Sequence, residues 1–445
     1  MITEAAKTLT DSLRLFTPCP PAADRECWEK LPEDLKARLI RNGEAYLHYE
    51  YPALTAVDFM EFTRSGNRSR YQDRLFARRT ALDSLVLAEC AEHRGRFLDD
   101  IINGLYLICE ENAWQLPAHN SYIRDTPQFP LPDVTRPVID LFAAETASVL
   151  AVAEYLLRSE LKEVSPFLSV MIDHELETRI FTPYLSEHFW WMGDGKSHMN
   201  NWTVWCTQNV LLSAFTRPLP KETQTAILTK AAGSIDYFLA EYGEDGCCDE
   251  GAQYYRHAGL CLFGCLEILN GITDHAFAFA WEQEKIRNIA SYILNVHVDT
   301  VYYVNFADCS PVAGRCNARE YLFGKRTGNQ ALMEFAASDY QNSEDPLTLD
   351  EHNLFYRLQT VFSHEEMMQY DRNPVIVHRD LYYESVGLFM ARDSRLYLAV
   401  KGGDNDDSHN HNDVGSFTIY KDGKPIFIDA GVETYTKKTF SPDPV

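Results

Sequence analysis

The chain has 445 residues, 45% of them hydrophobic and 12% aromatic, and its formal net charge is −24 at pH 7. This length can bury a large core and predicts two or three domains, and the composition excludes a mainly disordered protein. The acidic balance argues against nucleic acid and anionic membranes as partners.

The sequence also bears on the cellular compartment. It contains no apolar run near the roughly 20 residues that cross a bilayer, and its first residues lack the pattern of a signal peptide. Its 11 cysteines are scattered without paired spacing, which predicts reduced thiols. We therefore expect a cytoplasmic protein, or a periplasmic or secreted one if a signal segment has been removed.

From about residue 30 to residue 370, apolar residues recur at helical spacing, with short breaks at Gly, Pro or Asp. Some of the predicted helices are apolar on more than one side, which favours helices stacked in layers over a small bundle. The clearest predicted helices are Arg74–Ala91, Phe97–Cys109, Pro137–Leu157, Asn201–Phe215, Lys221–Glu241, Tyr254–Leu269 and Ala278–Val296.

A group of arginines lies at the start of this helical part. Such a group suits the sulfates or carboxylates of an acidic polymer, and it is equally consistent with the solvated face of a helix. Its members are Arg64, Arg68, Arg70, Arg74, Arg78 and Arg79.

Polar segments interrupt the helical pattern at several places. Trp114–Asn120 is a loop without an obvious folding role and contains His119 and Asn120. A similar segment runs from Asn305 to Asp308. Both segments are candidates to contact a ligand.

A tandem pair of asparagines, Asn200 and Asn201, begins one predicted helix beside Trp202 and Trp205. A single Asn at a helix start is usually a cap. Two together beside tryptophans favour a carbohydrate subsite, because aromatic faces stack on sugar rings and amides bind hydroxyls or carboxylates.

The segment Asp245–His257 places acidic residues and a glycine turn ahead of a helix. It includes Glu250, Tyr254 and Tyr255. Tyrosines are common in protein cores, so this segment alone leaves the two tyrosines either structural or functional.

From about residue 375 the pattern changes to short, alternating, β-branched runs separated by turns. It predicts a helical domain over residues 1–372 and an all-β domain over residues 373–445. These few strands cannot cover both sheets of a sandwich, so we expect the chain to stop before the last strands. The predicted strands are Tyr382–Arg392, Leu396–Val400, Gly415–Tyr420 and Pro425–Asp429.

The last two predicted strands flank Asp422 and Gly423, a strong signal for a tight hairpin turn. Ahead of this hairpin, residues 408–413 bring together His409, His411, two asparagines and a carboxylate, and Asp429 ends the returning strand. Imidazole and carboxylate suit a divalent metal. A polar surface loop is the alternative, but the density of these side chains and their hairpin anchor favour a metal site.

In order along the chain, these segments resemble the heparinase II/III-like polysaccharide lyases. The resemblance rests on Asn-Asn-Trp at 200–202, Glu-Gly-x-x-Tyr at 250–254 and His-Asn-His-Asn-Asp-x-Gly-Ser-Phe at 409–417. Trp114–Asn120 and Glu177–Leu185 are similar to that family as well. The resemblance implies an α+β multidomain fold, in which an incomplete (α/α) toroid precedes an antiparallel β-sandwich, truncated here.

The resemblance also implies cleavage of a uronate-containing polysaccharide by β-elimination. Asn201 then corresponds to the amide that neutralises the substrate carboxylate. Tyr254 corresponds to the tyrosine that moves the proton, with Tyr255 as the second choice, and His409 corresponds to the catalytic histidine of the β-domain. Further residues expected to contact substrate are His119, Asn120, Asn200, Trp202, Glu250, Tyr255, Arg256, Asn305 and Asn410.

By the same resemblance, His411 and Asp429 correspond to two ligands of one divalent metal ion, usually zinc. The third ligand is expected beyond Val445. The metal would anchor the hairpin and orient His409, which is a structural role.

The chain departs from several relatives at Trp202, where they have a histidine. This shifts proton transfer to Tyr254 and His409. A tyrosine can act as a base only if its pKa falls from about 10. Arg256, His257 or His409 is expected to supply the cation that lowers it.

Other functions stay open on sequence alone. A glycoside hydrolase would need two carboxylates beside the scissile bond, for which Asp245, Glu250 and Asp308 are available. A metal-dependent hydrolase and a glycan-binding protein inactivated through Trp202 are further alternatives. The expected partner is an anionic polysaccharide or oligosaccharide, with a glycosaminoglycan favoured over alginate because of the clustered arginines. A homodimer is left open.

Overall fold

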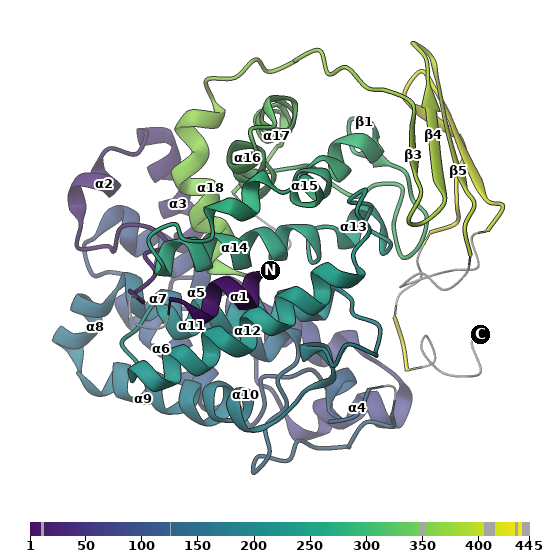
Figure 1. Cartoon of the computed structure of the whole chain (residues 1–445). Helices are drawn as coiled ribbons and strands as arrows, with labels where there is room; N and C mark the ends of the chain where they lie inside the picture. The colour runs from purple at the N-terminus through teal and green to yellow at the C-terminus, as the bar shows by residue number, and fades with distance from the viewer. Residues whose placement is uncertain (10–12, 125, 348–351, 405–413, 432–434, 438–445) are drawn as a thin grey trace.

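The computed structural model describes residues 1–445 apart from 10–12, 125, 348–351, 405–413, 432–434 and 438–445. Helices form the first part of the chain and a five-stranded antiparallel sheet forms the second (Figure 1). The helices are α1 (Ile2–Lys7), α2 (Arg25–Glu29), α3 (Glu33–Glu44), α4 (Ala56–Ser65), α5 (Ser69–Glu92), α6 (Leu98–Cys109), α7 (Leu141–Leu156), α8 (Arg158–Val164), α9 (Phe167–Leu176), α10 (Thr182–Ser186), α11 (Asn201–Phe215), α12 (Lys221–Glu241), α13 (Gly251–Tyr254), α14 (Gly259–Ile272), α15 (Glu284–Val296), α16 (Ala318–Thr327), α17 (Gln330–Asn342) and α18 (Leu354–Met367). Short 3₁₀-helices are η1 (Pro117–His119), η3 (Trp190–Met192) and η4 (Ala278–Glu282), and η2 (Glu177–Phe181) is a π-helix.

Three helices make up the centre of the helical part. Every residue of α11 is buried except Trp202, and α7 and α14 are buried almost as completely. α11 packs against both α7 and α14. Helices that are apolar on all sides must be enclosed by others, so the predicted layered arrangement of helices is confirmed. No helix in the described part of the chain is long and apolar enough to cross a membrane.

The predicted bounds of α11 and α12 are confirmed, but the helix predicted at Tyr254–Leu269 is interrupted. α13 ends at Tyr254, and α14 begins at Gly259 after Ala258 leaves helical geometry. A Cβ atom at Gly259 would lie 2.3 Å from the ring of Tyr255. The break therefore lets the Tyr255 ring pack into the core directly against the next helix.

The sheet is a meander with the order β3-β4-β5-β6-β7. Asp422 and Gly423 both have positive φ, +51° and +75°, as the tightest hairpin turns require, so the predicted hairpin is confirmed. The strand predicted at Tyr382–Arg392 is two strands, because the chain turns at Gly387, whose φ is +64°. The strands are β3 (Leu381–Tyr383), β4 (Leu388–Arg392), β5 (Leu396–Lys401), β6 (Phe417–Lys421) and β7 (Lys424–Phe427).

The inner face of the sheet is buried and its outer face carries exposed aromatic residues such as Phe389 and Phe417. The sheet stands beside α13, α15 and the short strands β1 (His297–Asp299) and β2 (Tyr302–Tyr303) (Figure 1). Arg392 donates to the carbonyl oxygens of Asn295 and His297 at 2.6 and 3.0 Å. The predicted fold class, a helical toroid followed by an antiparallel β-domain, is confirmed.

Candidate active site

Two tyrosine hydroxyl groups meet where the helical part faces the C-terminal segment. The hydroxyl of Tyr254, at the end of α13, lies 2.9 Å from that of Tyr435. Tyr435 in turn donates to the carboxylate of Asp308, which is 5% exposed. A carboxylate only accepts hydrogen bonds, so the donation runs from Tyr254 to Tyr435 to Asp308.

Two unusual backbone conformations support this pair. Gly251 opens α13 with φ of +87°, and a Cβ atom there would lie 2.7 Å from the carbonyl oxygen of Phe306. Ala307, the residue after Phe306, has a φ of +61°, a strained value for a residue other than glycine. Such strain collects at functional sites, and here the strained backbone directly precedes Asp308.

Glu250 fixes the start of α11. Its two carboxylate oxygens accept from the backbone nitrogen of Asn201 at 2.8 Å and from its Nδ2 at 2.7 Å. Asn200 is the N-cap, and its Oδ1 accepts from the backbone nitrogen of Trp202 at 3.1 Å. Asn201 is 1% exposed, and its Oδ1 has no hydrogen-bond partner among the described residues.

A second chain of polar side chains reaches the tyrosine pair from the predicted loop at 114–120. Nδ1 of His119 lies 2.7 Å from the carboxylate of Asp140, and Nε2 lies 3.2 Å from Nη2 of Arg68. The guanidinium carbon of Arg68 is 5.6 Å from the ring centre of Tyr435. Burial lowers the pKa of His119, which keeps its imidazole neutral.

The surroundings of Tyr254 oppose its ionisation overall. Burial raises the pKa of Tyr254 to about 12, while the hydrogen bond with Tyr435 and the charge of Arg68 act in the opposite direction. From the sequence, Arg256, His257 or His409 was expected to supply the nearby cation. The structure adds Arg68, whose charge lowers the pKa of Tyr254. Arg256 is held at another cavity, His257 contacts the Tyr254 ring at 6.2 Å, and His409 lies outside the described residues.

Trp202 lies beside this site. Its ring contacts the imidazole of His119 edge-on, at 4.7 Å between centres, and the ring of Trp190 at 5.0 Å. Trp205 stacks on His257 at 3.9 Å. Trp190 and Trp202 are partly exposed, whereas Trp205 is buried. The carbohydrate subsite expected at these tryptophans stays a prediction.

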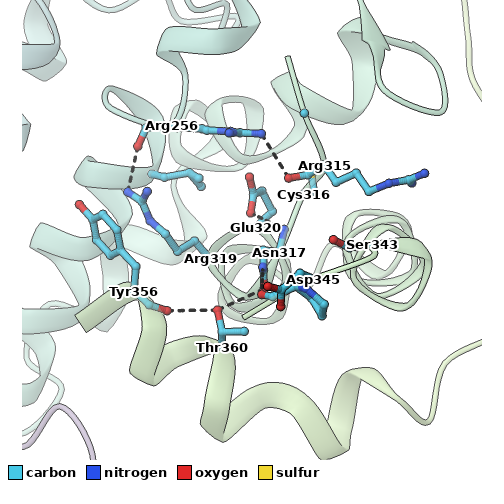
Figure 2. A pocket seen from close by; sticks show the side chains of 13 residues that line it. Arg256, Arg315, Cys316, Asn317, Arg319, Glu320, Ser343, Asp345, Tyr356 and Thr360 are labelled. Carbon is cyan, nitrogen blue, oxygen red and sulfur yellow. Dashed lines mark hydrogen bonds between the residues drawn. The ribbon is translucent and has the colours of Figure 1, made fainter. Parts of the chain in front are cut away.

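Three predicted substrate contacts lie elsewhere. Tyr255 is fully buried in the core. Both donated bonds of the Asn120 amide go to the carbonyls of Phe129 and Leu131. Arg256 donates to the carbonyl oxygens at 313 and 315 and lines a separate polar cavity of about 210 Å³ (Figure 2). Each of these side chains is held by contacts within the fold.

Asn305 joins the helical part to the end of the hairpin, where its Nδ2 donates to the backbone oxygen of Asp429 at 3.0 Å. The Oδ1 of Asp429 accepts from the backbone nitrogen of Gly431 at 2.8 Å. The predicted site residues His409, Asn410 and His411 lie outside the described residues. Within the described residues, no group of three or more metal-ligating side chains occurs.

Most of the clustered arginines are committed to ion pairs, which weakens their interpretation as a polymer-binding patch. Arg70 pairs with Glu61 and Arg74 with Asp58 at the surface. Arg78 and Arg79 both pair with the buried carboxylate of Glu111. Arg68 is the member that reaches the tyrosine pair.

Neither Tyr435 nor Asp140 was predicted from the sequence as a site residue. Asp140 precedes the apolar helix α7 in a helix-capping position, and its pairing with His119 is a tertiary contact across 21 residues. Tyr435 follows the predicted hairpin in sequence. The hairpin was therefore the local feature that indicated that residues after it lie against the helical part.

Comparison with known proteins agrees with this architecture. Residues 378–442 match the family model described as heparinase II/III-like, C-terminal. The chain resembles the solved structure of heparinase III, at 13% identity with a TM-score of 0.56, over 97% of this chain and 63% of that one. It also resembles a mutant heparan sulfate lyase of Pedobacter heparinus, at 13% identity with a TM-score of 0.51, over 98% and 61%. No curated protein matches the chain in sequence.

At this level of identity the solved structures establish the fold alone. The chain spans a little over three fifths of their length, 61% and 63%. The resemblance to heparinase II/III-like proteins that the motifs indicated is confirmed by the family match in the C-terminal part and by the shared fold.

Proposed function

We propose that this chain carries the active site of a lyase that cleaves uronate-containing polysaccharides by β-elimination. One observation carries the proposal: the hydroxyls of Tyr254 and Tyr435 share a hydrogen bond of 2.9 Å beside the strained loop that ends in Asp308. A hydrogen-bonded pair of phenols can take up a proton and return it. β-Elimination needs these two transfers.

In the proposed reaction Tyr254 acts as the phenolate and removes the C5 proton of the uronate. The electrons of the C5–H bond form a C4=C5 double bond, and the C4–O bond to the neighbouring sugar breaks. The proton then returns from the tyrosine pair to the departing glycosidic oxygen. Water is not consumed, and the phenolate is regenerated.

Removal of the C5 proton places additional negative charge on the substrate carboxylate. One Nδ2 hydrogen of Asn201 bonds Glu250, and we assign the other to that carboxylate, together with the imidazole of His409. A correctly placed donor of this kind typically accelerates a reaction by about 10²–10³-fold. Glu250 supports this role by fixing the amide plane of Asn201.

We further propose that His411 and Asp429 hold one divalent metal ion, which their ligand chemistry assigns as zinc. The bond from Gly431 fixes one oxygen of the Asp429 carboxylate. Hydrogen bonds of this kind commonly orient metal-ligating carboxylates. Bound there, the metal would fix the end of the hairpin. None of the proton transfers above passes through it.

The described contacts favour a lyase over a glycoside hydrolase. A hydrolase needs two carboxylates directed at the scissile bond. Glu250 is engaged by Asn201, Asp308 by Tyr435, and Asp245 by the backbone nitrogen and hydroxyl of Ser385 at 2.9 and 2.7 Å. All three candidate carboxylates are therefore engaged in hydrogen bonds within the protein.

We propose a glycosaminoglycan as the substrate class. Two similar structures are a heparinase and a heparan sulfate lyase, and this likeness supports the choice more directly than the arginine cluster does. Alginate, which also contains uronates, is the alternative.

The test is a panel of uronate polymers with ultraviolet detection of the unsaturated product. Tyr254→Phe should abolish turnover and leave the melting temperature nearly unchanged. The matched control is Tyr255→Phe, whose hydroxyl lies in the core and should not affect turnover. Activity retained by Tyr254→Phe, or lost equally in both variants, would contradict the assignment.

A further inference from the structure

Asp140, His119 and Arg68 form a continuous chain of contacts that ends at the tyrosine pair. We infer that Arg68 is the cation that supports the phenolate of this pair, and that Asp140 and His119 are positioning residues that set its guanidinium against Tyr435. The inference rests on the proposed function, because it names the group that makes Tyr254 usable as a base.

Asp140, the first member of this series of contacts, is held rigidly. Asp140 is fully buried and accepts from the backbone nitrogens of Leu116, Phe142 and Ala143 at 3.1, 3.1 and 2.7 Å. These bonds tie the carboxylate to the start of α7 and to the loop that carries His119. The carboxylate cannot turn without breaking several of them.

The direction of each side-chain bond follows from chemistry. A guanidinium only donates, so Nε2 of His119 accepts from Arg68. The proton of the neutral imidazole is then on Nδ1, where it is donated to Asp140. Both ring nitrogens are thus used within the protein. His119 is therefore placed to orient Arg68 and not to contact the substrate, which revises its predicted role.

The imidazole is also held by its neighbours. It lies parallel to the ring of Phe142, at 6.1 Å between centres, and edge-on to Trp202 at 4.7 Å. A ring clamped in this way keeps one orientation. Because Asp140 and these rings fix the imidazole, the imidazole in turn fixes the position of the Arg68 guanidinium.

The charge of Arg68 is not cancelled by a direct carboxylate partner within the described part of the chain. Its hydrogen-bond partners there are Oε1 of Gln72 at 3.3 Å and the neutral His119. Its neighbours on α5 differ, since Arg70 and Arg74 each pair with a carboxylate. Among these three arginines, Arg68 alone combines an unpaired charge with proximity to the tyrosines.

The charges around the pair give Arg68 a specific task. Asp308 and Glu250 oppose ionisation of Tyr254, and Arg68 favours it. Arg68 also interacts electrostatically with Tyr435, because its guanidinium lies over the Tyr435 ring. His257 contacts Tyr254 edge-on at 6.2 Å. Removal of Arg68 should therefore raise the pKa of Tyr254.

The experiment measures pH–rate profiles of the full chain and of four variants on the polymer that the panel identifies. Arg68→Gln should lower kcat/KM by about 10²–10³-fold and shift the limb that reports the base to higher pH. Arg68→Lys should restore much of the pH profile but less of the rate. His119→Phe, which keeps the ring contacts, should lower the rate by up to about 10²-fold through misplacement of Arg68. The control is Arg70→Gln, which removes a surface cation from the first turn of α5, next to Arg68, and should leave the rate and the pH profile unchanged.

A wild-type pH profile in Arg68→Gln would overturn the inference, as would a His119→Phe variant changed only in melting temperature. A second readout separates this failure from failure of the proposed function. The titration of Tyr254 can be followed by ultraviolet absorbance, as the difference between each protein and its Tyr254→Phe counterpart. Its midpoint should rise in Arg68→Gln even if no polymer is cleaved, and an unchanged midpoint would overturn the inference.

Discussion

The substitution Tyr435→Phe tests the tyrosine pair most sharply, because it removes a single oxygen atom. That atom accepts from Tyr254 at 2.9 Å and donates to Asp308. A neutral hydrogen bond contributes about 0.5–1.5 kcal/mol to stability and one to a charged group about 1.5–3 kcal/mol. Tyr435 is only half-buried, and water can replace part of both bonds. We therefore expect a loss of roughly 1–2 kcal/mol in unfolding free energy.

The effect on catalysis should be larger than the effect on stability. Once Tyr254 is ionised, the Tyr435 hydroxyl is expected to turn from Asp308 and donate to the phenolate. Without this hydroxyl, the phenolate loses that donor and the proton loses its return route. Removal of one such donor typically lowers the rate by about 10²–10³-fold. Turnover is measured by the ultraviolet absorbance of the product and stability by thermal unfolding.

The matched control is Tyr382→Phe, on the outer face of the sheet, where the tyrosine is 58% exposed. It should change neither quantity. The reasoning is refuted if Tyr435→Phe keeps turnover within about threefold of the wild type. It is also refuted if turnover falls only in step with the folded fraction.

Three further predictions concern the supporting structure. Gly251→Ala should destabilise the protein by at least about 1–2 kcal/mol, because φ is +87° and the new Cβ would lie 2.7 Å from a carbonyl oxygen. Its control, Gly233→Ala in α12, meets nothing within 4 Å and should stabilise by roughly 0.5–1 kcal/mol; equal melting temperatures would contradict the strain argument. Burial lowers the pKa of His297 to about 4, so its stabilising contribution is complete above about pH 6.5 and is lost as the pH falls towards 4. His297→Phe should therefore lose less melting temperature than the wild type on acidification, and an equal loss would contradict this. Asp429→Ala should lower the zinc content found by elemental analysis, and unchanged zinc would remove Asp429 from the metal site.

Much of the fold was predictable because its signals are local. The helical period predicts the extent of α11 and α12, and Asn200 and Pro220 mark where the two helices begin. The pair Asp422 and Gly423 specified the hairpin through two positive φ angles. The prediction failed at Tyr254–Leu269, because the apolar pattern continues through a break that is caused by packing of Tyr255 on Gly259.

The candidate site was only partly predictable because it is assembled by tertiary contacts. The motifs identified Asn201, Glu250 and Tyr254, and the structure joins the first two by two hydrogen bonds. Tyr435 reaches Tyr254 across 181 residues, a contact that no local pattern encodes. Arg256 was expected at the site because it follows Tyr254 closely, yet the turn after α13 directs it to another cavity.

The central claim is that the chain breaks glycosidic bonds by elimination, and the mass of the product tests it most directly. The full chain is incubated with a glycosaminoglycan in heavy-oxygen water, and the oligosaccharides are analysed by mass spectrometry. The account predicts an unsaturated uronate at the new non-reducing end and no heavy oxygen gained from the cleavage itself. A saturated product that carries one heavy oxygen per broken bond would identify a hydrolase and contradict the account.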